Sequence, residues 1–209
     1  MTDEQKETIK FYTTNDYLLI NSLLWGKDDQ TIDTLIRIIN EDGLGVMKEA
    51  REMGCDVRWG CTKEAGERIY QVYQKRFPVI SSETVKKQII ERAQADISNM
   101  MACMEPLTTD MILYRNIKTK LIGDLTEGQT VDYLGFSSCS LVPHIAEYAM
   151  YGSGGCTLFV ITVPVGTPAI RLDLMPEVQN EPDEVILPPI KFVVEKIDKE
   201  KNTVYMRVA

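Results

Sequence analysis

MILYRNI, at residues 111–117, is the first of three short segments that decide the fold of this 209-residue chain. It is an apolar run that leads to an arginine, Arg115. The second segment is GFSSCSL, at 135–141, and the third is EPDEVILPP, at 181–189. Apolar, β-branched and aromatic runs bounded by Gly, Pro and Asp are typical of strands. The three segments therefore predict strands whose ends carry polar side chains.

The rest of the C-terminal half has the same β pattern after Pro106. The last two runs flank the polar turn 198–202, which predicts a hairpin. A short helix is expected after Pro143, through about Tyr151. The predicted strands are 111–116, 130–137, 157–163, 168–174, 184–187, 190–197 and 203–208.

The N-terminal half has helical periodicity from about Thr14 to Met104. Apolar stripes recur at 17–24, 32–39, 69–77 and 85–100. Between the second and the third of these stripes, a further short helix is expected to end at Gly54. No repeat or low-complexity linker interrupts the chain. We therefore predict an α+β fold in a single domain, 1–209, with a mainly helical layer over about 1–105 and a mainly β core over about 106–209.

Composition excludes several classes of protein. A net charge of -8 leaves no excess of Lys and Arg to release phosphate counterions, so we expect no nucleic-acid binding. The apolar stretch 156–165 is far shorter than the ~20 residues of a membrane span, so we expect no membrane insertion. The start, MTDEQKETIK, lacks the features of a secretory signal. The expected location is the cytoplasm, or outside the cell by a route without a cleavable signal peptide.

Cysteine usage favours reduced structural thiols, because the five cysteines are widely spaced and odd in number. Cys55 and Cys61 are separated by five residues and have no nearby histidine. That spacing matches no common zinc pattern, so we predict no metal site.

Arg115 and the serines each allow a structural and a functional interpretation. The arginine is either a solvated charge at a strand end or a planar fork that binds phosphate oxygens in a bidentate way. The serines form either an exposed strand end with Ser140 near a helix cap, or a site where the Ser138 hydroxyl holds a catalytic carboxylate. A serine nucleophile is not expected, because the nucleophile-elbow pattern is absent and His144 is the only histidine.

Glu184 directly precedes the apolar run 185–187. Acidic residues before a strand commonly form a solvated turn. Held at the start of a buried strand, however, a carboxylate can hydrogen-bond a ribose hydroxyl and stabilise an oxocarbenium-like centre. Together with Arg115 and Ser138, this carboxylate suggests chemistry on a dinucleotide such as NAD.

In this order, the motifs resemble the ADP-ribosyltransferase exoenzyme family, the arginine-serine-glutamate class of clostridial binary-toxin enzymatic components and Rho-modifying exoenzymes. Its arginine after an apolar strand is similar to Arg115, its aromatic-x-Ser-Thr-Ser motif to 136–140, and its catalytic glutamate to Glu184. YTTNDYLLINSLL at 12–24 resembles the opening helix of the family. LFVITVPVGTPAI at 158–170 resembles its strand, Pro-x-Gly-Thr turn and next strand.

The resemblance implies a split, two-sheet β core that binds NAD as a substrate, with an N-terminal helical layer. Arg115 would bind the diphosphate, and Ser138 would orient Glu184. The backbone of Gly135 or Asn116 would hold the nicotinamide amide. Tyr148 is either an aromatic side chain against the nicotinamide or a core contact of a short helix.

Two positions depart from the family pattern. Cys139 replaces the central Thr of the serine motif, and Pro182 stands two residues before Glu184, where the family has an acceptor-directing Glu or Gln. Proline has no side-chain donor or acceptor, so Glu181 is the candidate to replace that function.

The sequence leaves three functions open. The first hypothesis is a mono-ADP-ribosyltransferase that modifies a protein target, as a toxin-like effector of bacterial or phage origin. The second is a NAD glycohydrolase, in which water is the acceptor. The third is a catalytically silent protein-binding module that keeps the fold.

Overall fold

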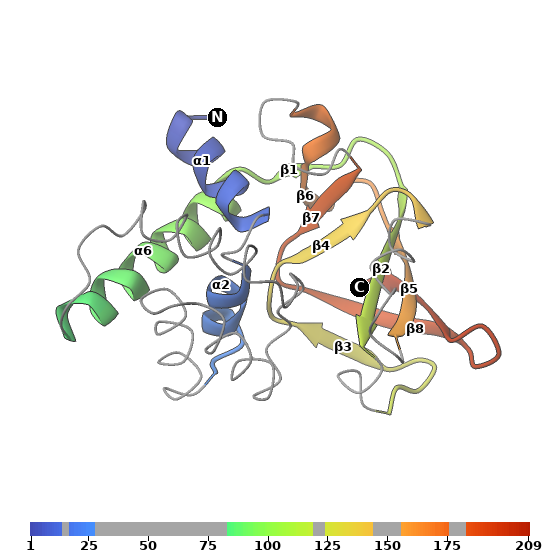
Figure 1. Cartoon of the computed structure of the whole chain (residues 1–209). Coiled ribbons are helices and arrows are strands. Elements are labelled where there is room, and N and C mark those ends of the chain that lie inside the picture. The colour runs from blue at the N-terminus through green and yellow to red at the C-terminus, as the bar shows by residue number, and fades with distance from the viewer. Residues whose placement is uncertain (14–16, 28–82, 119–123, 144–155, 176–182) are drawn as a thin grey trace, which may run out of the picture. The chain divides into compact units, whose positions relative to one another are not determined.

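The computed structural model describes residues 1–13, 17–27, 83–118, 124–143, 156–175 and 183–209 (Figure 1). The chain divides into two compact units, Thr2–Met100 and Met101–Ala209, with Met1 assigned to the second. That residues 1–209 form a single domain stays a prediction. Within the described ranges, no helix has the length and apolarity needed to cross a membrane.

Three described helices form the first unit: α1 (Asp3–Phe11), α2 (Tyr17–Leu24) and α6 (Glu83–Ala102), which ends just past its boundary. The stripes at 17–24 and 85–100 predicted α2 and α6, whereas α1 precedes the predicted helical region. Thr2 and Gln5 start α1 with a capping box, in which Gln5 N donates to Thr2 Oγ1 at 3.2 Å and Thr2 N donates to Gln5 Oε1 at 2.8 Å. This capping signal in the sequence marks a helix that apolar periodicity alone did not reveal.

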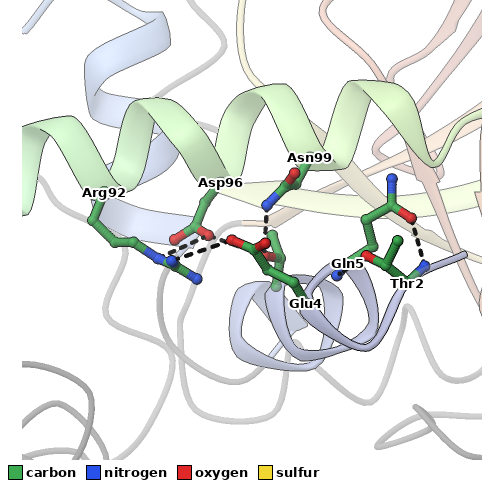
Figure 2. A network of polar contacts seen from close by, with 7 residues as sticks. Thr2, Glu4, Gln5, Arg92, Asp96 and Asn99 are labelled. Carbon is green, nitrogen blue, oxygen red and sulfur yellow. Dashed lines mark hydrogen bonds and ion pairs between the residues drawn. The ribbon is translucent and has the colours of Figure 1, made fainter.

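A polar cluster joins α1 to α6 (Figure 2). The buried Thr8 hydroxyl donates to Asp96 Oδ1 at 3.0 Å, and Arg92 Nε lies 3.4 Å from the same carboxylate oxygen. Arg92 also contacts Glu4 at 3.4 Å, and Asn99 Nδ2 donates to Thr8 Oγ1 at 3.5 Å. These five residues are called the α1–α6 cluster below. Their side chains bind one another, so the cluster fixes how the two helices pack.

The second unit is a mixed sheet with strand order β1-β6-β7-β4-β2-β5-β9-β8-β3 among the described residues (Figure 1). The β5–β9 pair is parallel and the other neighbours are antiparallel. The strands are β1 (Glu105–Pro106), β2 (Met111–Lys118), β3 (Thr130–Tyr133), β4 (Ser137–Ser140), β5 (Cys156–Val163), β6 (Pro168–Arg171), β7 (Glu184–Leu187), β8 (Ile190–Asp198) and β9 (Thr203–Val208).

The sheet splits between β4 and β2. Along its whole length β2 pairs with β5, from Met111↔Val163 to Lys118↔Cys156. On its other edge, the described residues give it one bridge to β4, Tyr114↔Ser140. Four strands therefore lie on one side of the split and five on the other. This arrangement confirms the predicted α+β fold with a split β core.

Alternating side chains of both parts form the apolar core. Its fully buried members include Leu113 of β2, Val163 of β5, Val185 and Leu187 of β7, and Val194 of β8. Burial of each such side chain contributes roughly 1.5–3 kcal/mol. The expected Pro-x-Gly-Thr turn follows β5, and its Gly166 adopts a φ of 87°, which favours glycine.

The predicted strand 130–137 is wrong, because the segment contains the end of one strand and the start of another. Tyr133 pairs with Ile190 of β8, whereas Ser137 pairs with Leu187 of β7. The chain therefore crosses the split between β3 and β4. Long-range pairing, which local composition does not encode, decides where each strand ends.

Two further boundaries differ from the predictions. Strand 168–174 ends at Arg171 and continues as a 3₁₀ turn, Leu172–Leu174. The serines form β4 itself, and Ser140 Oγ accepts from Val142 N at 3.0 Å in the turn after it, so Ser140 closes a turn. Most of the predicted helix from Pro143 to Tyr151, and the stripes 32–39 and 69–77, lie outside the described residues.

Candidate active site

Three neighbouring strands carry the three residues that the sequence singled out. Arg115 lies on β2, Ser138 on β4 and Glu184 on β7, and these strands are consecutive in the sheet. Ser140 links them, because it pairs with Tyr114 on one side and with Glu184 on the other. The fold therefore brings the arginine, serine and glutamate segments together at the split.

The Arg115 guanidinium is held from two directions. Its Nη1 donates to the Ser138 carbonyl at 2.8 Å, and its Nη2 donates to the Tyr133 hydroxyl at 2.9 Å. The guanidinium carbon also lies 5.3 Å from the centre of the Tyr133 ring. Arg115 is half-buried, and these contacts join β2 to β4 and β3. The interpretation of Arg115 as a solvated edge charge does not fit this geometry.

Strand register places Ser138 and Glu184 on a common face. Ser138 pairs with Ile186 and Ser140 with Glu184, so Ser138 and Glu184 are diagonal neighbours on adjacent strands. Glu184 is 9% exposed at the start of a fully buried strand. This burial is expected for a carboxylate held at the start of a strand and not for a residue of a solvated turn. That Ser138 orients this carboxylate stays a prediction.

Asn116 lies on that same face of the sheet, because it follows Tyr114 by two positions on β2. Arg115 leaves β2 on the opposite face, together with Leu113, and reaches Ser138 through the serine carbonyl. Both polar atoms of the Asn116 carboxamide are buried without a hydrogen-bond partner among the described residues. A buried amide without a partner costs about 1–3 kcal/mol. Its donor and acceptor suit a ligand that offers a carboxamide or hydroxyls.

The remaining predicted positions divide into described and undescribed residues. Gly135 is buried in the segment between β3 and β4. Cys139 faces the apolar core, so the thiol at the central position of the serine motif does not alter the polar face. Glu181, Pro182 and Tyr148 lie outside the described residues, and their predicted roles are untested.

Sequence reasoning missed Tyr133. The run TVDY at 130–133 predicts a strand but carries no sign that its last residue contacts Arg115. That contact follows from the register of β3 on β8 and from the path of residues 134–136, which only the fold supplies.

The described cysteines, Cys103, Cys139 and Cys156, are buried free thiols, and burial raises the pKa of the Cys103 thiol. In the part of the chain that the structure describes, no three His, Cys, Asp or Glu side chains gather as metal ligands would.

No family model and no curated protein matches the chain, but solved structures do. Vis toxin, an ADP-ribosyltransferase from Vibrio splendidus, is 14% identical, with a TM-score of 0.53 over 99% of this chain and 72% of the toxin. C3stau2 from S. aureus, solved with NAD, is 16% identical, with a TM-score of 0.53 over 100% and 86%. The catalytic domain of VsdC from Aeromonas hydrophila is 14% identical, with a TM-score of 0.51 over 99% and 100%. The chain thus has the fold of ADP-ribosyltransferase toxins.

Proposed function

We propose that this protein is a mono-ADP-ribosyltransferase that uses NAD as its substrate. One observation carries the proposal: Arg115, Ser138 and Glu184 lie on three consecutive strands at the split of the sheet. The fold that the chain shares with ADP-ribosyltransferase toxins, one of them solved with NAD, supports it.

NAD offers the groups that these side chains can bind. The planar guanidinium of Arg115 matches the oxygens of a diphosphate. Asn116 and Gly135 are the candidates for the carboxamide of the nicotinamide, and Tyr148 for its ring. A NAD molecule lying across the split would meet Arg115 from one face of β2 and Asn116 from the other.

The reaction breaks the bond between the ribose C1′ and the nicotinamide nitrogen. The electron pair of that bond leaves with nicotinamide, and the positive charge moves to the ribosyl ring. The Glu184 carboxylate stabilises this oxocarbenium-like centre, with Ser138 holding the carboxylate. A nucleophile of the acceptor then bonds to C1′ and gives up its proton to a base, for which Glu181 is the candidate, or to water.

We propose that the acceptor group belongs to a target protein, and that this protein acts as a toxin-like effector. The residue two before Glu184 is Pro182, which offers no side chain to direct the acceptor group, so Glu181 is the candidate for that role. Pro182 also favours the second candidate function, NAD glycohydrolysis, because water needs less positioning than a protein side chain.

The test measures two products with one set of proteins. Nicotinamide release from NAD is compared between wild type, Glu184→Gln and the matched control Glu195→Gln, whose carboxylate is 45% exposed and pairs with Arg207 on β9. We expect release by wild type and by the control only. Transfer of labelled ADP-ribose onto a protein in a eukaryotic or bacterial lysate supports the transferase, and release without transfer supports the glycohydrolase. Absence of both products, with a folded protein, would favour the silent binding module.

A further inference from the structure

We infer that Tyr133 positions Arg115 for NAD binding and so is part of the binding machinery. The inference rests on the proposed function and extends it to a residue outside the arginine, serine and glutamate motifs. Tyr133 touches the guanidinium twice, through its hydroxyl at 2.9 Å and through its ring at 5.3 Å. An arginine that lies over an aromatic ring and donates to its hydroxyl has less freedom to move than a solvated arginine.

The two described partners of the guanidinium come from one short segment, 133–138. Tyr133 ends β3 and Ser138 lies in β4, so the crossing between these strands supplies the hydroxyl, the ring and the carbonyl. The segment therefore surrounds the arginine on two sides. A change at Tyr133 should displace the guanidinium toward the Ser138 carbonyl.

The scaffold holds Tyr133 itself in place. Its backbone pairs with Ile190 of β8, and its ring meets Phe192 edge-on, with centroids 6.4 Å apart at 65°. Phe192 is 4% exposed and belongs to the apolar core. The tyrosine is thus a rigid support, and its hydroxyl is the end that faces the arginine. A bidentate contact with a diphosphate depends on such a fixed fork, because a mobile side chain loses entropy on binding.

Tyr133→Phe tests the hydroxyl and retains the ring. Loss of one hydrogen bond to a charged group should raise the KM for NAD about five- to twentyfold, with kcat changed less than about twofold. Tyr133→Leu removes the ring as well and should raise KM further. The matched control is Tyr205→Phe on β9, whose ring lies 5.7 Å from Lys196 Nζ and should leave both constants unchanged.

A double-mutant cycle separates positioning from general support of the fold. We expect Tyr133→Phe to lower kcat/KM less than about twofold in an Arg115→Lys background, because the geometry it maintains is already lost. Thermal unfolding of all variants shows whether they fold.

The outcomes distinguish the positioning role of Tyr133 from the proposed NAD-dependent function. An unchanged KM in Tyr133→Phe, or an equal loss in both backgrounds, would overturn the positioning role while leaving NAD cleavage by wild type intact. A folded wild type that neither binds nor cleaves NAD would overturn the proposed function and this inference with it.

Discussion

The α1–α6 cluster and the Arg115 site, which comprises Arg115, Asn116, Tyr133, Ser138 and Glu184, both hold an arginine beside buried polar groups. They differ in the partners of these polar groups. In the cluster, the polar side chains contact one another. Asp96 of α6 accepts from Thr8 of α1, and Arg92 reaches Glu4 of α1 and also pairs with Asp96 within α6. At the split, Arg115 contacts a backbone carbonyl and a tyrosine, and the amide of Asn116 beside it has no partner among the described residues. Buried polar side chains that bind one another stabilise the fold, whereas a buried carboxamide with neither its donor nor its acceptor bonded among the described residues points to a ligand.

The difference predicts where a substitution acts. Removing a member of the cluster should lower the free energy of unfolding, because its former partners stay buried. Removing a member of the Arg115 site should change NAD kinetics more than stability. Substitutions in each group can test this division between residues that stabilise the fold and residues that bind the substrate.

Glu184→Gln should lower kcat for NAD cleavage by ~10² to 10⁴, or about 3–5 kcal/mol, because the amide cannot stabilise the positive ribosyl centre. The change nearly preserves the shape of the side chain at the start of β7, so the unfolding midpoint should move little. Steady-state nicotinamide release and urea unfolding measure the two effects. A large loss of stability with unchanged kcat would reverse the assignment of Glu184.

Asp96→Ala should lower the free energy of unfolding by about 2–4 kcal/mol. Asp96 is 1% exposed, so its loss leaves the Thr8 hydroxyl without its acceptor and Arg92 without the ion pair to Asp96. Asp96→Asn keeps an acceptor for Thr8 and should cost less. Urea unfolding gives both values. A change within about 0.5 kcal/mol would mean that the cluster contributes no stability.

Among the described residues, the sequence predicted most of the strands, because continuous runs of apolar and β-branched residues coincide with β2, β7 and the β8–β9 hairpin. The order of the motifs also placed Arg115 among the candidate site residues. The break between β3 and β4 could not be predicted, since local composition does not encode that these strands pair on opposite sides of the split. The Tyr133 contact was missed for the same reason, because register and crossing path determine it.

Asn116→Leu tests whether the Asn116 carboxamide supports the fold or binds the substrate. Leucine has a similar shape and no polar group to desolvate, so the free energy of unfolding should stay unchanged or rise by about 1 kcal/mol. The KM for NAD should rise roughly three- to tenfold as a hydrogen bond to the substrate is lost. Urea unfolding and nicotinamide release on the same preparation compare the two. Destabilisation with unchanged KM would place Asn116 with the structural cluster.

Thr2→Ala should have the smallest effect, about 1 kcal/mol of unfolding free energy, because the Thr2 hydroxyl accepts from Gln5 N at the exposed start of α1. The loss should shrink in a Gln5→Ala background, since both side chains belong to one capping box. Urea unfolding of the four proteins in this cycle measures the coupling, and nicotinamide release should be the same in all of them. A cap that altered NAD kinetics without altering stability would contradict the division, because α1 would then act on the substrate and not on the packing of its own unit.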